Sequence, residues 1–113
     1  MKYRKVIFYE DYFYSFFEKQ RPKVKAKIIW TLENVIEATE RIPEEYFKHL
    51  VGTDGLYEIR VQSGSDIFRI FCFFDKTKLV VLANGFQKKT QKTPIFEIKK
   101  ALKIKNEYEQ GKK

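Results

Sequence analysis

The sequence has few of the residues that build disulfide bonds and metal sites, with one cysteine and one histidine among 113 residues. One cysteine cannot form an internal disulfide, and one histidine excludes a metal site made of several histidines. Cys72 lies in the apolar run Phe68–Phe74, where a thiol usually behaves as a small buried hydrophobic group. His49 is interpreted as a surface residue rather than a general base. We therefore expect no metal and no cofactor, and a reducing, cytoplasmic location.

Long apolar runs are also missing. The N-terminal run Val6–Tyr9 ends at once at Glu10 and Asp11, which is too short for a signal peptide. No other stretch is long enough to cross a bilayer, so we expect no membrane partner. Hydrophobic residues still make up 43% of the chain, enough for a core, and the length suits one domain over residues 1–113.

The net charge of +8 is unevenly distributed along the chain. Residues 84–113 hold nine lysines and three acidic residues, which is +6 of the total. Such a concentration favours a polyanionic partner, either a nucleic acid or an acidic protein. A solvated charged helix explains it equally well, so charge alone does not decide.

The spacing of apolar residues predicts the secondary structure. In chain order it indicates a strand (residues 4–9), two helices (13–18, then from Pro22 to before Pro43), three strands (56–62, 67–74 and 79–83) and a last helix from Pro94. Short turns separate the three later strands, so residues 56–86 are expected to form an antiparallel meander. Residues 109–113 are expected to fray.

Two arginines interrupt these strands. Strict alternation places Tyr57, Ile59 and Val61 on the core side and Glu58, Arg60 and Gln62 on a wet face. Arg69 sits in an otherwise apolar strand, where a guanidinium needs an anionic partner. A cross-strand pair with Glu58 or Asp66 is the better interpretation of Arg69 taken alone. If Arg60 shares its face, the two arginines can instead converge on a phosphate.

A basic segment follows the third strand of the meander. Lys88, Lys89 and Lys92 lie within five residues, together with Thr90 and Gln91, and Phe86 beside them could stack on a base. A solvated loop is about as good an interpretation of this segment alone. Taken with the arginines, it indicates phosphate recognition. RNA can be cleaved there without metal or histidine, because the ribose 2′-OH can attack the neighbouring phosphate if the protein aligns it and stabilises the added charge.

Three motifs and their order carry a resemblance to a known family. They are Leu56-Tyr57-Glu58-Ile59-Arg60, Phe68-Arg69-Ile70-Phe71, and the run from Gly85 to Pro94 (GFQKKTQKTP), followed by Glu97-Ile98 and Ala101. Over roughly residues 56–101 the chain resembles the phage-derived HigB-like branch of the RelE/ParE toxin superfamily. The GF-x-KKT-x-KTP run is fairly specific, whereas the early helices are generic.

The resemblance implies both a fold and an activity. The fold is α+β, with two N-terminal helices packed on a small antiparallel sheet and a C-terminal helix. The activity is that of a type II toxin, a metal-independent endoribonuclease that cuts messenger RNA in the ribosomal A site and is neutralised by an antitoxin, commonly a helix-turn-helix protein. Relatives of the same fold poison DNA gyrase instead, and a non-catalytic RNA-binding domain is a third alternative.

The same resemblance assigns roles to particular residues. Arg60 and Arg69 match the family's strand arginines, and Lys88, Lys89 and Lys92 match its terminal basic motif, so these five are the expected catalytic residues. Phe86, Thr90 and Gln91 are the expected RNA-binding residues. Some relatives carry a histidine or tyrosine late in the chain, where this sequence has Phe86 and Lys88–Lys92.

Overall fold

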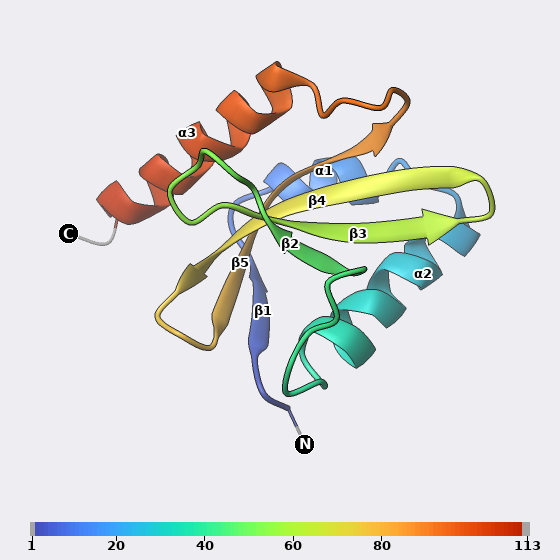
Figure 1. Cartoon of the computed structure of the whole chain (residues 1–113), viewed down its shortest axis with the longest axis horizontal. Coiled ribbons are helices and arrows are strands. Elements are labelled where there is room, and N and C mark those ends of the chain that lie inside the picture. Colours follow the sequence, from blue (N-terminus) through green and yellow to red (C-terminus); the bar gives the residue numbers. More distant parts are fainter. Residues whose placement is uncertain (1, 112–113) are drawn as a thin grey trace.

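A five-stranded sheet forms the centre of the structure, a computed structural model that describes residues 2–111 (Figure 1). The strands are β1 (Lys5–Phe8), β2 (Phe47–His49), β3 (Tyr57–Ser63), β4 (Asp66–Asp75) and β5 (Leu79–Lys88). They lie in the order β1-β5-β4-β3-β2, with β3, β4 and β5 forming the expected antiparallel meander. The expectation of a wholly antiparallel sheet is wrong, because β1 pairs parallel to β5. The helices between these strands make the crossover that parallel pairing needs.

The helices are α1 (Tyr12–Phe17), α2 (Pro22–Thr31), which continues into a π-helical turn η1 (Leu32–Ile36), and α3 (Ile95–Gly111). The fold is therefore mixed α+β, but α1 and α2 do not precede the whole sheet: they lie between β1 and β2, and only α3 is C-terminal. Fraying from residue 109 is wrong, since α3 continues through Gly111, while Lys112 and Lys113 lie outside the described residues. No helix within residues 2–111 is long and apolar enough to cross a membrane.

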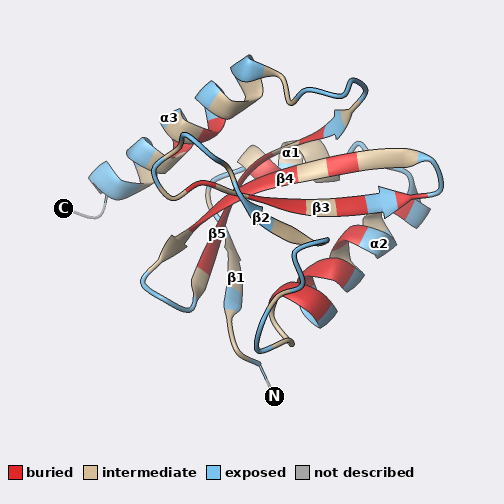
Figure 2. Ribbon diagram, viewed as in Figure 1, coloured by how far each residue is buried: buried red, intermediate tan, exposed pale blue. Residues whose placement is uncertain are grey.

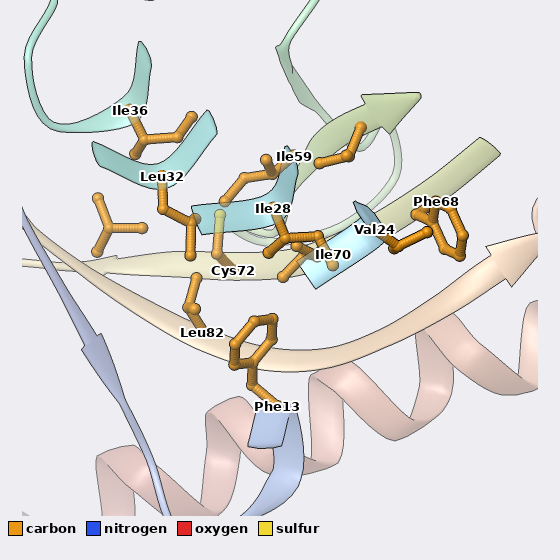
Figure 3. Close-up of a cluster of buried hydrophobic side chains, with 12 residues drawn as sticks. Phe13, Val24, Ile28, Leu32, Ile36, Ile59, Phe68, Ile70, Cys72 and Leu82 are labelled. Atoms are coloured by element: carbon orange, nitrogen blue, oxygen red, sulfur yellow. The ribbon is translucent and has the colours of Figure 1, made fainter. Parts of the chain in front are cut away.

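Helices cover both faces of the sheet, so there are two hydrophobic clusters (Figures 1 and 2). On one face Phe13 of α1 and Val24 and Ile28 of α2 pack on Ile59 and Ile70 (Figure 3). On the other face the helix α3 is held by a separate set of buried side chains, which are Leu56, Phe71, Phe73, Val81, Ala83, Phe86, Ala101 and Ile104. Cys72 is buried as expected, and burial raises the pKa of its thiol above the usual range, which keeps it protonated.

Strand β5 runs five residues past its expected end at Ala83. A glycine makes this extension compatible with helix α1. A Cβ atom at Gly85 would lie 2.5 Å from the nearest ring atom of Phe16. Only glycine lets the aromatic ring pack so closely on the strand. The strand therefore continues to Lys88 and carries that residue to the edge of the site described below.

The three-residue strand β2 was not predicted. It pairs with β3 only from Phe47↔Ile59 to His49↔Tyr57, and the Arg60 N–H donates to the Tyr46 carbonyl at 2.9 Å. Phe47 stacks on Tyr57, with ring centroids 4.9 Å apart. The pairing of β2 with β3 stops there, so Val61–Ser63 of β3 have no partner in β2.

Candidate functional site

The two strand arginines lie directly opposite each other. The register of β3 and β4 pairs Arg60 with Arg69, and directly opposed residues in an antiparallel pair share a face of the sheet. The prediction that both guanidiniums lie on one face is thus confirmed. This is the face that α3 covers farther along, beyond Phe71.

Glu58 is the partner of both arginines. Its Oε1 accepts from Arg60 Nε at 3.0 Å, lies 3.0 Å from Arg60 Nη2 and 3.8 Å from Arg69 Nε. The other suggested partner, Asp66, pairs instead with Arg21 at 2.9 Å. Glu58 was expected on a wet face, but its side chain is only 5% exposed. The structural pairing expected for Arg69 alone is therefore present.

The ion pairs with Glu58 neither neutralise both arginines nor satisfy every hydrogen-bonding group among the three side chains. Two guanidiniums share one carboxylate, so one positive charge remains in excess. The Arg69 side chain is 11% exposed, and within residues 2–111 neither Arg69 Nε nor Glu58 Oε2 has a hydrogen-bond partner. Burial lowers the pKa of the Arg69 guanidinium, Glu58 opposes that shift, and Arg60 adds to it. An anion bound at Arg69 would neutralise the excess positive charge.

Two hollows open on either side of Arg69. The edge hollow, of about 330 Å³, lies between Lys27 of α2, Glu45 and Tyr46 ahead of β2, and Arg60, Gln62 and Arg69 of the sheet. The loop hollow, of about 350 Å³, is lined by Ile67, Arg69, Lys88, Lys89, Thr90 and Gln91. None of the described residues lining the loop hollow is acidic. Because Arg69 and Ile67 line both, the two hollows adjoin.

The structure brings most of the predicted basic segment to this place. Lys88 ends β5 opposite Ile67, and Lys89, Thr90 and Gln91 follow it around the loop hollow. Lys92 is exposed and lies outside the lining of that hollow. The Thr90 hydroxyl donates to the Lys92 carbonyl at 2.8 Å, which folds the loop back on itself.

Phe86 is not placed as expected. It lies opposite Arg69 across β4 and β5, but only 7% of it is exposed, and its ring centroid is 5.3 Å from that of Phe71. The ring belongs to the hydrophobic cluster under α3 and offers no open face for a base. The expected stacking role is therefore wrong. The strand alternation that puts Arg69 on this face also turns Phe86 toward the helix.

Sequence reasoning also missed residues that line the site. Glu58 was considered only as a structural partner on a wet face, whereas the structure buries it. Lys27, Glu45 and Tyr46 reach the edge hollow from α2 and the chain before β2. No sequence signal pointed to these three. His49 lies exposed on β2, with its ring centroid 5.2 Å from that of Tyr57, which agrees with a surface residue.

Metal coordination has no candidate in the described part of the chain, since no three His, Cys, Asp or Glu side chains gather within residues 2–111.

A family model described as "Phage derived protein Gp49-like (DUF891)" matches residues 15–106. This match begins within α1 and spans α2, the meander and most of α3. A comparison with curated proteins gave no match.

Proposed function

The chain belongs to the family of phage-derived Gp49-like proteins, and from this premise we propose that it is the toxin of a type II toxin–antitoxin pair. Its proposed activity is that of a HigB-like member of the RelE/ParE superfamily, an endoribonuclease that cuts messenger RNA on the ribosome. Its proposed partners are the ribosome, messenger RNA and a cognate antitoxin of the helix-turn-helix class, all in the cytoplasm.

The position of Arg69 between the two hollows is the observation that carries this proposal. Through it the arginine pair and the Lys88–Gln91 loop form one cationic surface, although they come from separate stretches of the chain. Only one carboxylate, Glu58, contacts the arginines among the described ion pairs, and it is buried behind them. A surface with this excess of positive charge suits the phosphate backbone of RNA.

The proposed reaction uses the substrate's own nucleophile. The ribose 2′-oxygen forms a bond to the adjacent phosphorus, the bond from phosphorus to the 5′-oxygen breaks, and the products are a 2′,3′-cyclic phosphate and a 5′-hydroxyl. Arg60 and Arg69 would stabilise the added negative charge on the phosphate oxygens. One proton leaves the 2′-OH and one reaches the 5′-oxygen, and Lys88 and Lys89, which line the loop hollow beside Arg69, are the groups proposed to transfer them.

The remaining predicted residues have supporting roles in this proposal. Thr90 and Gln91 line the loop hollow and would bind RNA through side-chain hydrogen bonds. Lys92, which lies outside the hollow, would contribute to long-range attraction of the backbone rather than to the reacting phosphate.

Pulse labelling of cells that express the protein without an antitoxin tests this function. We expect incorporation of labelled amino acids to stop first, and messenger RNA to accumulate cuts within translated regions. An Arg69→Ala variant expressed to the same level should permit growth. If thymidine incorporation stops first while protein synthesis continues, the protein inhibits gyrase instead and the RNase proposal is wrong.

A further inference from the structure

The edge hollow continues from the arginines onto helix α2. Lys27 lines this hollow together with Arg60 and Arg69, and its Nζ atom lies 5.2 Å from the centre of the Trp30 ring. Trp30 is the one tryptophan of the sequence. It is 46% exposed and belongs to neither hydrophobic cluster, so its ring is not needed to fill the core.

Helix geometry places the Trp30 ring beside Lys27, which lines the hollow. Lys23, Lys27 and Trp30 are four and three residues apart, so they lie on one stripe of α2. Long side chains on a helix lean toward its N-terminus, which lays the indole over the turn that carries Lys27. An ammonium group over the indole face holds the two side chains together. Lys27 thus connects the hollow that the two arginines line to the indole of Trp30.

The open edge of β3 adds a backbone donor to the same place. Successive N–H groups of a strand point to opposite edges, so the Gln62 N–H points to the same edge as that of Arg60, which donates to Tyr46. Strand β2 does not extend this far, and Gln62 itself lines the edge hollow. Glu45 is the one acidic residue among the described lining residues. Its carboxylate can accept a hydrogen bond from the amino group of a base.

We propose that Lys27 and Trp30 extend the edge hollow into a subsite for one nucleotide of single-stranded RNA, next to the phosphate held by Arg60 and Arg69. Trp30 stacks on the base, and Lys27 binds the phosphate of the same nucleotide. This inference rests on the proposed function and adds binding residues on α2, which none of the family motifs include. Stacking on an indole tolerates any base, so the subsite contributes affinity more than sequence choice.

Because Trp30 is the only tryptophan, its fluorescence reports directly on the subsite. The experiment titrates the intact protein with a fluorescently labelled single-stranded RNA oligonucleotide. Anisotropy of the label measures binding, and a parallel titration with unlabelled RNA measures tryptophan emission. We expect emission to be quenched at the same midpoint as the anisotropy rises. Trp30→Leu should weaken binding roughly tenfold, about the loss that one stacked base accounts for.

A matched pair of lysine variants separates the subsite from general charge attraction. Lys27→Ala and Lys23→Ala each remove one exposed ammonium from the same stripe of α2, but only Lys27 lines the edge hollow. We expect Lys27→Ala to weaken binding several-fold more than Lys23→Ala. Thermal melts should show that all three variants fold like the parent chain, because these side chains lie on the surface.

Failure of this inference is distinguishable from failure of the proposed function. If RNA binds and Arg69→Ala weakens binding, but Trp30 emission stays constant and Trp30→Leu binds normally, the subsite does not exist while the arginine site stands. Equal effects of the two lysine variants would also overturn it. If the free protein binds no RNA, the subsite is again refuted, and cleavage of message on programmed ribosomes then tests the proposed function separately.

Discussion

The face of the sheet that carries α3 has two ends that differ in what covers them. At the covered end, Phe71, Phe73 and Val81 are buried beneath Ala101 and Ile104 of the helix. At the open end, Arg60 and Arg69 lie beside the two hollows. Figure 2 shows β4 buried along most of its middle and intermediate at Asp66, Ile67 and Arg69, near the open end.

The same strands run through both ends, and their side chains alternate in the same way. What differs is whether the helix supplies apolar surface to bury them. At the covered end burial stabilises each side chain directly. At the open end the charges are removed from water only in part, and one carboxylate serves two guanidiniums. The covered end therefore stabilises the fold, whereas the open end retains charge that can act on a ligand.

The largest expected effect is a loss of catalysis when a residue at the open end is substituted. Arg69→Ala should lower cleavage on programmed ribosomes roughly 10²–10³-fold, the usual loss for one charge stabiliser of a transition state. Phe73→Leu at the covered end should lower the melting temperature yet leave cleavage per folded molecule unchanged. Melts of both variants must accompany the assay. The reverse result, with Phe73→Leu inactive and Arg69→Ala active, would show that the ends do not divide in this way.

Glu58→Ala should have the next largest effect, and on stability. It leaves two opposed guanidiniums without their shared carboxylate, and loss of one partner from a buried ion pair costs about 3 kcal/mol. Urea unfolding measures this loss. The double variant Glu58→Ala/Arg69→Ala should recover part of it, because it removes the unpaired charge. An additive loss in the double variant would mean that the three groups do not act as a unit.

The two lysines of the basic loop sharpen the comparison further. Lys89 lines the loop hollow and Lys92 does not. We expect Lys89→Ala to reduce cleavage about tenfold and Lys92→Ala less, because an exposed charge outside the hollow is screened by salt. Cleavage rates measured at two salt concentrations check this order. A larger loss of cleavage for Lys92→Ala than for Lys89→Ala would show that the reacting phosphate does not lie in the loop hollow.

The smallest effect concerns the covered end at alkaline pH. The Tyr108 hydroxyl donates to Asp75 at 2.7 Å, and this hydrogen bond, with burial, raises the pKa of Tyr108 from 10.0 to about 12. A folded-state pKa above the unfolded value gives stability that is complete below pH 10 and is lost as pH rises toward 12. The urea midpoint of the parent chain should therefore fall more steeply over this window than that of Tyr108→Phe. Parallel curves would contradict the hydrogen bond's role.

The arginine pair could be predicted from the sequence because a short turn fixes the register. Ser63 pairs with Asp66 across Gly64 and Ser65, and every pair back to Tyr57↔Cys72, including Arg60↔Arg69, follows from that turn. Gly64 has a positive φ of 62°, which suits glycine at the turn. Local rules thus determine the most important contact of the candidate site.

What covers each face could not be predicted in the same way. Alternation assigned Glu58 to solvent and left Phe86 free to stack, but both are buried. Phe86 packs in the cluster with α3, whose position depends on contacts distant in sequence. The strand β2 has only three residues, too few for a periodic sequence pattern. The parallel pairing of β1 with β5 joins residues distant in the sequence, and no local sequence pattern indicates it. Lys27 joins the site only because α2 packs next to the edge of β3.

The most direct test of the central claim compares two messages on programmed ribosomes. One is ordinary RNA, and the other carries a single 2′-deoxy nucleotide immediately 5′ of the mapped cut. Metal-independent attack by the 2′-OH at the Arg60–Arg69 site predicts that the ordinary message is cut to a 2′,3′-cyclic phosphate and that the deoxy message remains intact at that bond. Cleavage of the deoxy message at the same bond would exclude the proposed nucleophile and leave the arginines and Lys88–Lys92 with binding alone.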